Sequence, residues 1–382
     1  MENKILYLDY MSTTPVDPRV VDVMKKSLSD DFGNASSQHV FGLQAREKIE
    51  TARAQVAALI NADPKEIIFT SGATESINLA LKGAALFYQR QGKHIITMST
   101  EHKAGLDTCH YLESLGFEIT YLNPQKNGLL DLDQLKKAIR RDTILASIMH
   151  VNNETGVVQD ILSIGKCLRE QGVLFHVDAA QSAGKIAIDL KNLPVDLMSL
   201  ASHKVYGPKG VGALYVRRQP RVQLIAQMQG GDQENKLRSG TLATHQIVSM
   251  GEAYKIAREN LIDESKRIAA LRDQFEKNIS VLSGVHFNGD KKNRVCGCSN
   301  FSIENIDAPT LLEKINNVVA ISQGSACNAV DPEPSHVLTA MGLSRDQANR
   351  SFRVSFGRFT TEQDVQKATA CLINEINRQR CL

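Results

Sequence analysis

The sequence has no apolar stretch long enough to cross a membrane, and its first residues lack the charged-then-apolar pattern of a signal peptide. It also has no internal repeat, low-complexity run or Pro/Ser-rich linker. Basic and acidic residues nearly balance, at 45 and 42, and the net charge of +3 is too small to favour binding of nucleic acid. We therefore expect a soluble cytoplasmic protein with no membrane contact and no direct DNA binding.

Cysteine is sparse and irregularly spaced. The chain contains seven, an odd number, which fits a reducing compartment better than a framework of disulfides. Cys296 and Cys298 lie close together, but one intervening residue and the lack of a second pair do not match the spacing of a zinc site. We expect these two cysteines to pack in a core.

The dominant pattern is an alternation of short apolar runs with helical segments. The runs with the length of strands are 67–70, 94–98, 118–122, 144–149, 173–177, 195–200 and 212–216. This alternation predicts an α/β fold with a mostly parallel seven-stranded sheet flanked by helices.

The rest of the chain predicts a second unit. A charged amphipathic helix is expected at 261–279 and another helical segment at 361–380. Because 382 residues exceed one core, we expect a large domain at 14–260 and a smaller α+β domain made of 1–13 and 261–382.

Lys204 follows the apolar run 195–200 in a loop of small residues. A buried parallel strand delivers such a loop to the carboxyl edge of the sheet, where ligands bind. A desolvated lysine there is a candidate nucleophile for the carbonyl group of a cofactor such as pyridoxal phosphate. The alternative is an ordinary surface lysine.

A second loop, Ser71 to Ser76, connects the strand-like run 67–70 to a helical run at 77–86. Free N–H groups at the start of a helix suit a phosphate, so Ala73 and Thr74 become candidate ligands, with the Ser76 hydroxyl assisting. The alternative is that Thr74 simply caps the helix.

A third loop begins at Asp178, directly after the run 173–177. An acid at this position can keep the ring nitrogen of a pyridine cofactor protonated, which turns the ring into an electron sink. The alternative is a helix cap. A phosphate loop, an acid and a lysine in this order are more specific than any one of them.

With these loops in place, the chain resembles a cysteine desulfurase of the class V aminotransferase group. The matching segments run nearly end to end: YLDY, TTPVDPRV, FTSGATES, TEHKA, SIMHVNNETGVVQD, HVDAAQS, SHKVYGPKG, RSGT, GSAC and RVSFGRFTTE. The resemblance implies fold type I of the pyridoxal-phosphate enzymes, with the smaller domain carrying the catalytic cysteine loop. It also implies conversion of L-cysteine to L-alanine, with the sulfur passing to acceptors for iron–sulfur cluster assembly and tRNA thiolation.

The resemblance also assigns roles to individual side chains. Lys204 would bind pyridoxal 5'-phosphate, Asp178 would pair with its ring nitrogen, and His102 would stack on the ring. Arg353 would hold the substrate carboxylate, a task suited to its planar fork. The other positions that match cofactor or substrate contacts are Gln181, Asn153, His203 and Thr241, the last reaching the phosphate of a neighbouring subunit in a homodimer.

Cys327 matches the nucleophile that takes the sulfur as a persulfide. Taken alone, a cysteine is more often a small buried hydrophobe. An unperturbed thiol has a pKa of about 8.5, so Cys327 needs a nearby base or cation, and His102 or the cofactor is the expected proton acceptor. The resemblance makes sulfur-acceptor proteins the expected partners. An iron–sulfur scaffold is less expected, because the sequence ends at Leu382, before the tail to which that partner docks in the family.

Several positions depart from the family pattern. Ala201 stands where a phosphate-binding serine is usual, so Ser202 would have to replace it. Gln323 and the segment 328–331 differ around the cysteine, and Lys236 replaces a glycine near the expected dimer contact.

Two alternatives remain open at this point. One is a selenocysteine lyase or another aminotransferase of the group, although transamination needs no mobile thiol such as Cys327. The other is a binding or regulatory homologue with low activity, suggested by Ala201, Gln323, Lys236 and the short C-terminal end.

Overall fold

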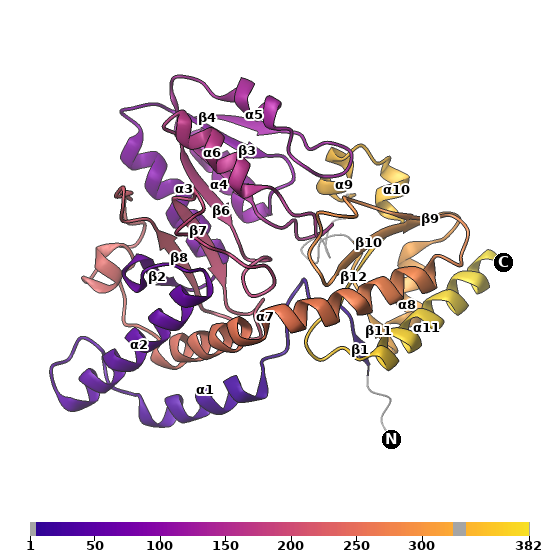
Figure 1. The fold of residues 1–382 in the computed structure, drawn as a ribbon, viewed down its shortest axis with the longest axis horizontal. Helices are drawn as coiled ribbons and strands as arrows, with labels where there is room; N and C mark the ends of the chain where they lie inside the picture. Colours follow the sequence, from indigo (N-terminus) through magenta and orange to yellow (C-terminus); the bar gives the residue numbers. More distant parts are fainter. Residues whose placement is uncertain (1–4, 324–333, 382) are drawn as a thin grey trace.

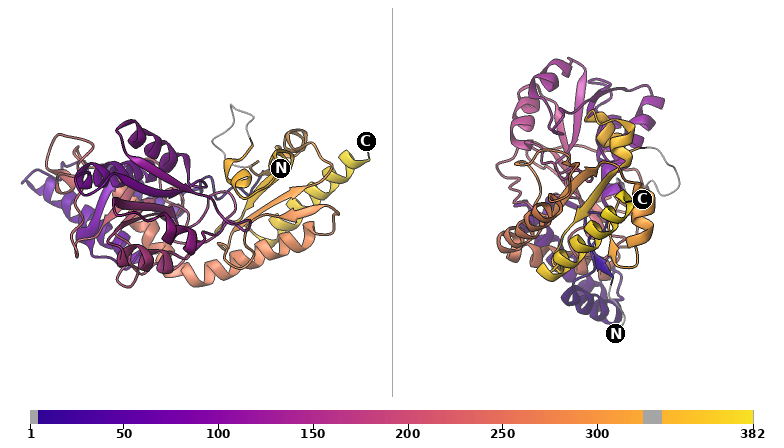
Figure 2. Two further views of the ribbon diagram at one scale, coloured as in Figure 1. Left: turned by 90° about the horizontal axis from the view of Figure 1, so that it is seen from above. Right: turned by 90° about the vertical axis from the view of Figure 1, so that its right-hand side faces the viewer.

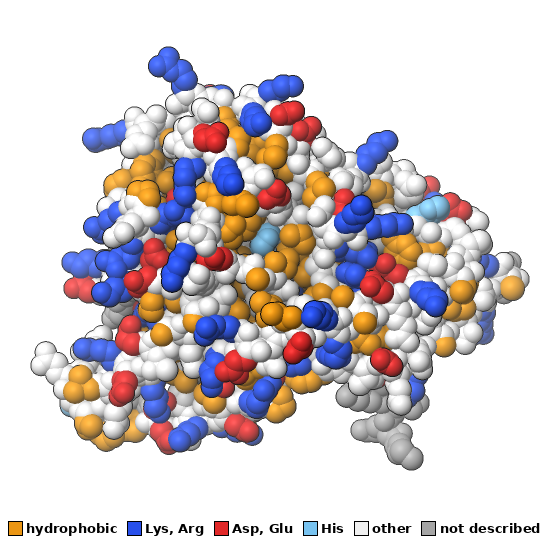
Figure 3. All heavy atoms as spheres, in the orientation of Figure 1, with side chains coloured by type: hydrophobic (Ala, Val, Ile, Leu, Met, Phe, Trp, Pro, Cys, Tyr) orange, Lys and Arg blue, Asp and Glu red, His pale blue; other side chains and the backbone are white. Residues whose placement is uncertain are grey.

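The computed structural model describes residues 5–323 and 334–381. A broad α/β part and a smaller α+β part lie side by side, and the long helix α7 (Thr244–Ile279) runs beneath both (Figures 1 and 2). Positive and negative side chains are interspersed over the face shown in Figure 3, in keeping with the balanced composition. Among the described residues, no helix is long and apolar enough to span a membrane.

The larger part is built on a seven-stranded sheet. In spatial order its strands are β2 (Ile67–Thr70), β8 (Gly212–Val216), β7 (Leu197–Ala201), β6 (Leu174–Asp178), β5 (Thr143–Met149), β3 (His94–Met98) and β4 (Glu118–Leu122). Only the pairings of β8 with its two neighbours are antiparallel. The predicted sheet is confirmed, and the carboxyl ends of β5, β6 and β7 open towards one edge.

Helices cover both faces of this sheet. They are α2 (Val40–Leu59), α3 (Ala73–Tyr88), α4 (Lys103–Ser114), α5 (Leu132–Ala138), α6 (Ile161–Glu170) and the first half of α7. Helix α1 (Pro18–Asp30) packs on the outside of α7, and two short 3-10 helices, η1 (Pro64–Glu66) and η2 (Gln233–Lys236), complete this part. Successive strand residues face opposite layers, as the pleat requires. Phe69 packs in the core that includes α2, α6 and α7, whereas Ile68 packs with α3 and α4.

Among its described residues, the smaller part contains two small sheets and four helices of its own, packed with the second half of α7. Its elements are β1 (Leu6–Tyr7) with β11 (Val319–Ala320), the antiparallel strands β9 (Val285–Phe287), β10 (Cys298–Ile303) and β12 (Ser351–Ser355), and helices α8 (Ala308–Ile315), α9 (His336–Ala340), α10 (Arg345–Asn349) and α11 (Glu362–Arg380). The helix expected at 361–380 is thus confirmed, with Thr361 as its N-cap.

Helix α7 begins at Thr244, well before the predicted start at 261. Its first half contributes Ala257 to the large core, and its second half contributes Ile268 to the small one. The expected domain boundary at 260/261 therefore falls inside one continuous helix, between residues of the two cores, and the boundary itself stays a prediction.

Candidate active site

Lys204 lies just beyond the end of β7, at the carboxyl edge of the sheet. Its Nζ donates to two backbone carbonyls of the N-terminal segment, that of Met11 at 2.5 Å and that of Ser12 at 2.7 Å. Burial, with the positive charges of Lys185 and Arg353 adding to it, lowers the pKa of this amine from 10.5 to about 7. A large fraction of Lys204 is therefore a neutral amine at neutral pH, which is the nucleophilic form.

We expect the Lys204 amine in the cofactor-free protein to lose its proton near pH 7. Because the neutral amine reacts and the ammonium does not, its reactivity should rise with pH through that value. Trace acetylation across a pH series, read by peptide mass analysis, measures this midpoint, and the exposed Lys209 of the same loop provides the comparison. A midpoint near 10.5 would contradict the desolvated environment of Lys204.

Asp178 is the last residue of β6, and its side chain is almost fully buried. Its Oδ1 accepts a hydrogen bond from the backbone N–H of Ala180 at 2.9 Å. Burial raises the pKa of this carboxyl, while the nearby His102 and Lys204 oppose the increase. The alternative of a helix cap is wrong, because turns and no helix follow β6.

His102 is the N-cap of α4. Its Nδ1 accepts from the backbone N–H of Ala104 at 3.1 Å, which leaves Nε2 to carry the proton of the neutral ring. Burial lowers the pKa of His102, and the neighbouring Asp178 partly opposes this. His102 is therefore held as a neutral imidazole whose free nitrogen is Nε2.

The loop before α3 forms an anion cradle. The N-cap is Gly72, and no side chain caps the helix, so the backbone N–H groups of Ala73 and Thr74 remain available. Nothing lies within 4 Å of the position that a Cβ on Gly72 would take, which leaves room for a ligand. Thr74 therefore does not cap the helix, and that alternative for its role is wrong.

Two hydroxyl groups behave differently around this cradle. The Ser76 hydroxyl is buried and bonded to Thr70 at 2.7 Å and to the Gly72 carbonyl at 3.2 Å, so its expected help with a phosphate is wrong. The Ser202 hydroxyl, by contrast, is completely buried and has no hydrogen-bond partner among the described residues. An orphaned buried hydroxyl is the kind of group that a bound phosphate would satisfy.

His203 lies beside Ser202, and its Nδ1 is 3.1 Å from the hydroxyl oxygen of Thr13. Burial, with the charges of Lys204 and Lys209, lowers the pKa of His203 to about 4. His203 is therefore neutral at neutral pH and can donate a hydrogen bond to an anion without carrying charge.

Gln181 and Asn153 supply amide groups near Lys204 and Arg353. Gln181 donates through Nε2 to the Met11 carbonyl at 2.7 Å, the same carbonyl that Lys204 contacts. The Asn153 Oδ1 is buried and unpartnered within the described part of the chain. These groups, together with Asp178 and the cradle, fit a phosphate-bearing pyridine cofactor.

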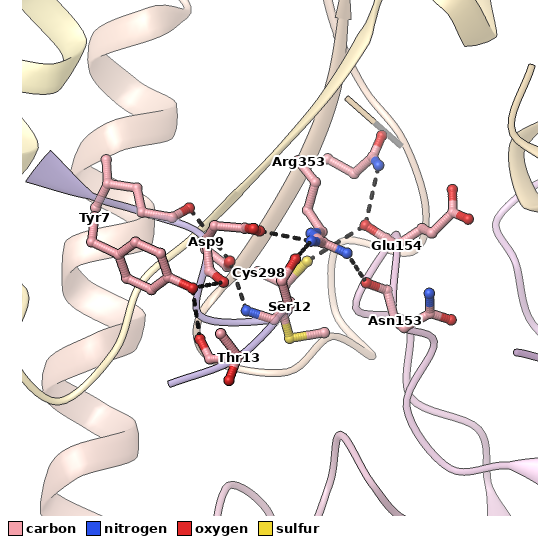
Figure 4. A network of polar contacts seen from close by, with 12 residues as sticks. Tyr7, Asp9, Ser12, Thr13, Asn153, Glu154, Cys298 and Arg353 are labelled. Carbon is pink, nitrogen blue, oxygen red and sulfur yellow. Dashed lines mark hydrogen bonds and ion pairs between the residues drawn. The ribbon is translucent and has the colours of Figure 1, made fainter. Parts of the chain in front are cut away.

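Arg353, on β12, is buried and central to the network in Figure 4. Its NH1 donates to the Asn153 carbonyl at 2.8 Å, and its NH2 forms an ion pair with Asp9 at 2.7 Å. NH2 also donates to the Ser12 hydroxyl at 2.6 Å. Since Ser12 contacts Lys204 through its carbonyl, one short segment joins the expected cofactor lysine to the expected carboxylate-binding arginine.

The remaining predicted residues lie apart from this arrangement. Thr241 is solvent-exposed, so its expected role depends on a second subunit. Cys327 lies outside the described residues. Cys298 is fully buried and Cys296 half-buried, both packed against apolar neighbours, so their predicted packing role is confirmed. No cluster of metal-binding side chains occurs among the residues described.

Lys236, the departure near the expected dimer contact, has a positive φ of 66°, and so do its neighbours Glu234 and Asn235. Such angles favour glycine. The turn is held by the Glu234 carboxylate, which is buried against Arg53 at 2.7 Å and accepts the Phe69 N–H at 2.6 Å.

Sequence reasoning missed three residues of the site. The carbonyls of Met11 and Ser12 hold Lys204, and Lys185 donates to the Oε1 of Gln181 at 3.0 Å. Burial, with the charge of Arg353 adding to it, lowers the pKa of Lys185 to about 8. The two carbonyls have no side-chain signal, but Lys185 follows Gln181 by four residues and a helical turn there could have suggested the contact.

Known proteins identify the family. The family model described as aminotransferase class-V matches residues 6–368. A cysteine desulfurase named IscS from Methylococcus capsulatus is 56% identical over 376 residues, which are 98% of this chain and 93% of the relative. A solved NifS-like protein is 34% identical with a TM-score of 0.92, covering 98% of this chain and all of that one. The structure of SspA in complex with cysteine is 43% identical with a TM-score of 0.84, covering 93% and 99%.

The chain therefore belongs to the class-V aminotransferase family and, within it, to the cysteine desulfurases. The fold expected from the resemblance is confirmed.

Proposed function

We propose that the protein binds pyridoxal 5'-phosphate through Lys204, converts L-cysteine to L-alanine, and keeps the released sulfur as a persulfide on Cys327. The observation that carries this proposal is the contact of Ser12 with both Lys204 and Arg353, which joins a partly neutral lysine to a buried arginine at the edge where Asp178 ends its strand. These groups match the needs of an amino acid that must be held by its carboxylate while its amine is directed at an electrophilic carbonyl carbon.

The cofactor site follows from the same geometry. When bound, pyridoxal phosphate supplies an electrophilic carbonyl carbon and a ring that accepts electron density from the substrate. Asp178 would keep a proton on the ring nitrogen. The free N–H groups of Ala73 and Thr74, with Ser202 and His203, would hold the phosphate, and Thr241 of a second subunit would complete that site in a homodimer.

The chain's own residues would then divide the chemistry. Arg353 holds the substrate carboxylate, with Asn153 and Gln181 fixing the orientation. Lys204, released from the cofactor, removes the proton from the substrate α-carbon, a step for which a pKa near 7 is well matched.

The sulfur step involves Cys327. Its thiolate attacks the substrate sulfur, so an S–S bond forms while the Cβ–S bond breaks and its electron pair stays with carbon. The thiol proton goes to a nearby base. The candidate is the His102 imidazole, whose basic nitrogen is Nδ1 in the tautomer selected by the Ala104 N–H. In sum, L-cysteine and the thiol give L-alanine and the persulfide, and an acceptor thiol then takes the sulfur.

The acceptors proposed are proteins that pass sulfur to iron–sulfur cluster assembly and tRNA thiolation. A cytoplasmic location is part of the same proposal. It is supported by the six cysteines seen in the described residues, all of which are free thiols.

Treating the cofactor-loaded protein with L-cysteine without a reductant tests the role of Cys327. The peptide containing Cys327 should gain the mass of one sulfur atom, because the thiolate accepts the sulfur and nothing removes it. In a second measurement with a thiol reductant added to release the sulfur, Cys327→Ala should show no sulfide release while still binding L-cysteine. The matched Cys296→Ala variant, which alters a packed thiol, should keep it. Sulfide release by Cys327→Ala at the wild-type rate would refute the assignment.

A further inference from the structure

Arg353 already has an anionic partner before any substrate arrives. Figure 4 shows its guanidinium between Asp9 and Ser12 on one side and Asn153 on the other. The contacts to these three groups use three of its five N–H donors. One hydrogen on NH1 remains, and so does Nε, which is buried and unpartnered among the described residues. A substrate carboxylate must therefore share the guanidinium with the Asp9 carboxylate.

The backbone holds Asp9 in place independently of Arg353. The Asp9 carbonyl accepts from the Tyr7 hydroxyl and from the Ser12 N–H, each at 3.0 Å. Asp9 also pairs with Ser355, whose N–H donates to the Leu8 carbonyl at 2.7 Å. Because Ser355 is on the same strand as Arg353, the acid and the arginine belong to one rigid frame. Asp9 therefore stays beside the guanidinium when a ligand binds.

Apart from Asp9, the ionisable groups near Arg353 include two lysines, Lys185 and Lys204, and one buried acid, Glu154, whose pKa is raised by burial although Arg353 opposes the increase. Its guanidinium lies close enough to Lys185 and Lys204 to help lower the pKa of both. Without Asp9, the full charge of Arg353 and the partial charges of Lys185 and Lys204 would attract an incoming carboxylate in a buried site. Electrostatic attraction of that kind is strong where water is excluded. The Asp9 carboxylate offsets one of these charges.

We propose that Asp9 is a built-in counter-ion that weakens the hold of Arg353 on the carboxylate shared by the substrate and the product. The inference rests on the proposed role of Arg353 as the carboxylate ligand. L-cysteine and L-alanine carry the same carboxylate, so Asp9 weakens the binding of both amino acids by a similar factor. Uniform weakening raises KM without slowing the chemical step, and it lets alanine leave. Asp9 touches neither the reacting atoms nor the cofactor site and is a positioning residue.

The variant Asp9→Asn tests this proposal, because asparagine keeps an oxygen that accepts from NH2 and loses only the charge. Calorimetric titration with L-alanine on the cofactor-loaded enzyme gives one dissociation constant. Titration with propionate, which has the carboxylate but no amino group, gives another on both the loaded and the cofactor-free protein. We expect both ligands to bind about tenfold more tightly to the variant, a change of ~1.4 kcal/mol. The KM for L-cysteine should fall by the same factor, and kcat should not rise.

Glu276→Gln is the matched control. Glu276 forms a 2.7 Å ion pair with Arg294, and the exposed fractions of the two pairs are nearly equal: 4% and 18% for Arg294 and Glu276, 2% and 18% for Arg353 and Asp9. The Glu276→Gln variant should change the stability of the fold but should leave the dissociation constants of L-alanine and propionate unchanged. Unchanged or weaker binding by Asp9→Asn would overturn the proposal. Arg353→Lys tests the role of Arg353 separately from that of Asp9. If this variant leaves propionate binding unchanged, the proposed role of Arg353 as the carboxylate ligand fails, whatever Asp9→Asn shows.

Discussion

Lys204→Ala is expected to lower the rate of alanine formation by at least about 10³-fold, because it removes both the amine that binds the cofactor and the base for the α-carbon proton. The structure supports both tasks. Burial and two neighbouring cations favour the neutral amine, and two carbonyls fix its position. The rate should be measured as alanine formed per active site with saturating L-cysteine.

Lys209→Ala is the matched control for this loss. Lys209 lies five residues further along the same loop and is exposed to solvent. Its replacement should leave the rate unchanged. An alanine-forming rate for Lys204→Ala within about tenfold of the wild type would exclude the assigned role of Lys204.

Asp178→Asn is expected to reduce kcat by about 10²- to 10³-fold, in the range seen when one preorganised electrostatic group is removed from an active site. Asparagine preserves the shape and the acceptor for the Ala180 N–H but cannot balance a positive charge on the ring nitrogen. The loss should therefore appear in kcat and in the absorbance spectrum of the bound cofactor.

Asp196→Asn controls for the loss of a buried carboxylate from the same sheet. Asp196 directly precedes β7, so it lies at the opposite edge, where it accepts the Phe175 N–H at 2.8 Å and lies 3.4 Å from Arg217. This change should lower the stability of the fold and leave kcat intact. Equal losses of kcat in both variants would mean that Asp178 acts only through the fold.

The sheet was predictable from the sequence because its strands, apart from the edge strand β4, are buried on both faces and appear as continuous apolar runs. The start of α7 could not be predicted from the sequence. Its first half packs against other helices, and Ala243 provides no side-chain cap to signal where the helix begins. The positive φ of Lys236 was equally hidden, because it is imposed by the buried pairing of Glu234 with Arg53.

For the site, strand ends located Asp178 and Lys204, since parallel strands bring their carboxyl ends to one edge. The direction of the Ser76 hydroxyl could not be predicted, because it depends on a contact with Thr70 across the turn. The Met11 and Ser12 carbonyls could not be predicted either, because a backbone acceptor leaves no trace in the residue type. The alternative of a low-activity homologue is disfavoured by the lowered pKa of Lys204 and by Asp178 at its strand end.

The central claim is tested most directly by measuring L-alanine and sulfide in the same sample of cofactor-loaded protein with L-cysteine and a thiol reductant. The account predicts equal amounts of the two products, both lost in Lys204→Ala. Sulfide without alanine, or neither product from protein that shows the absorbance of bound cofactor, would contradict it.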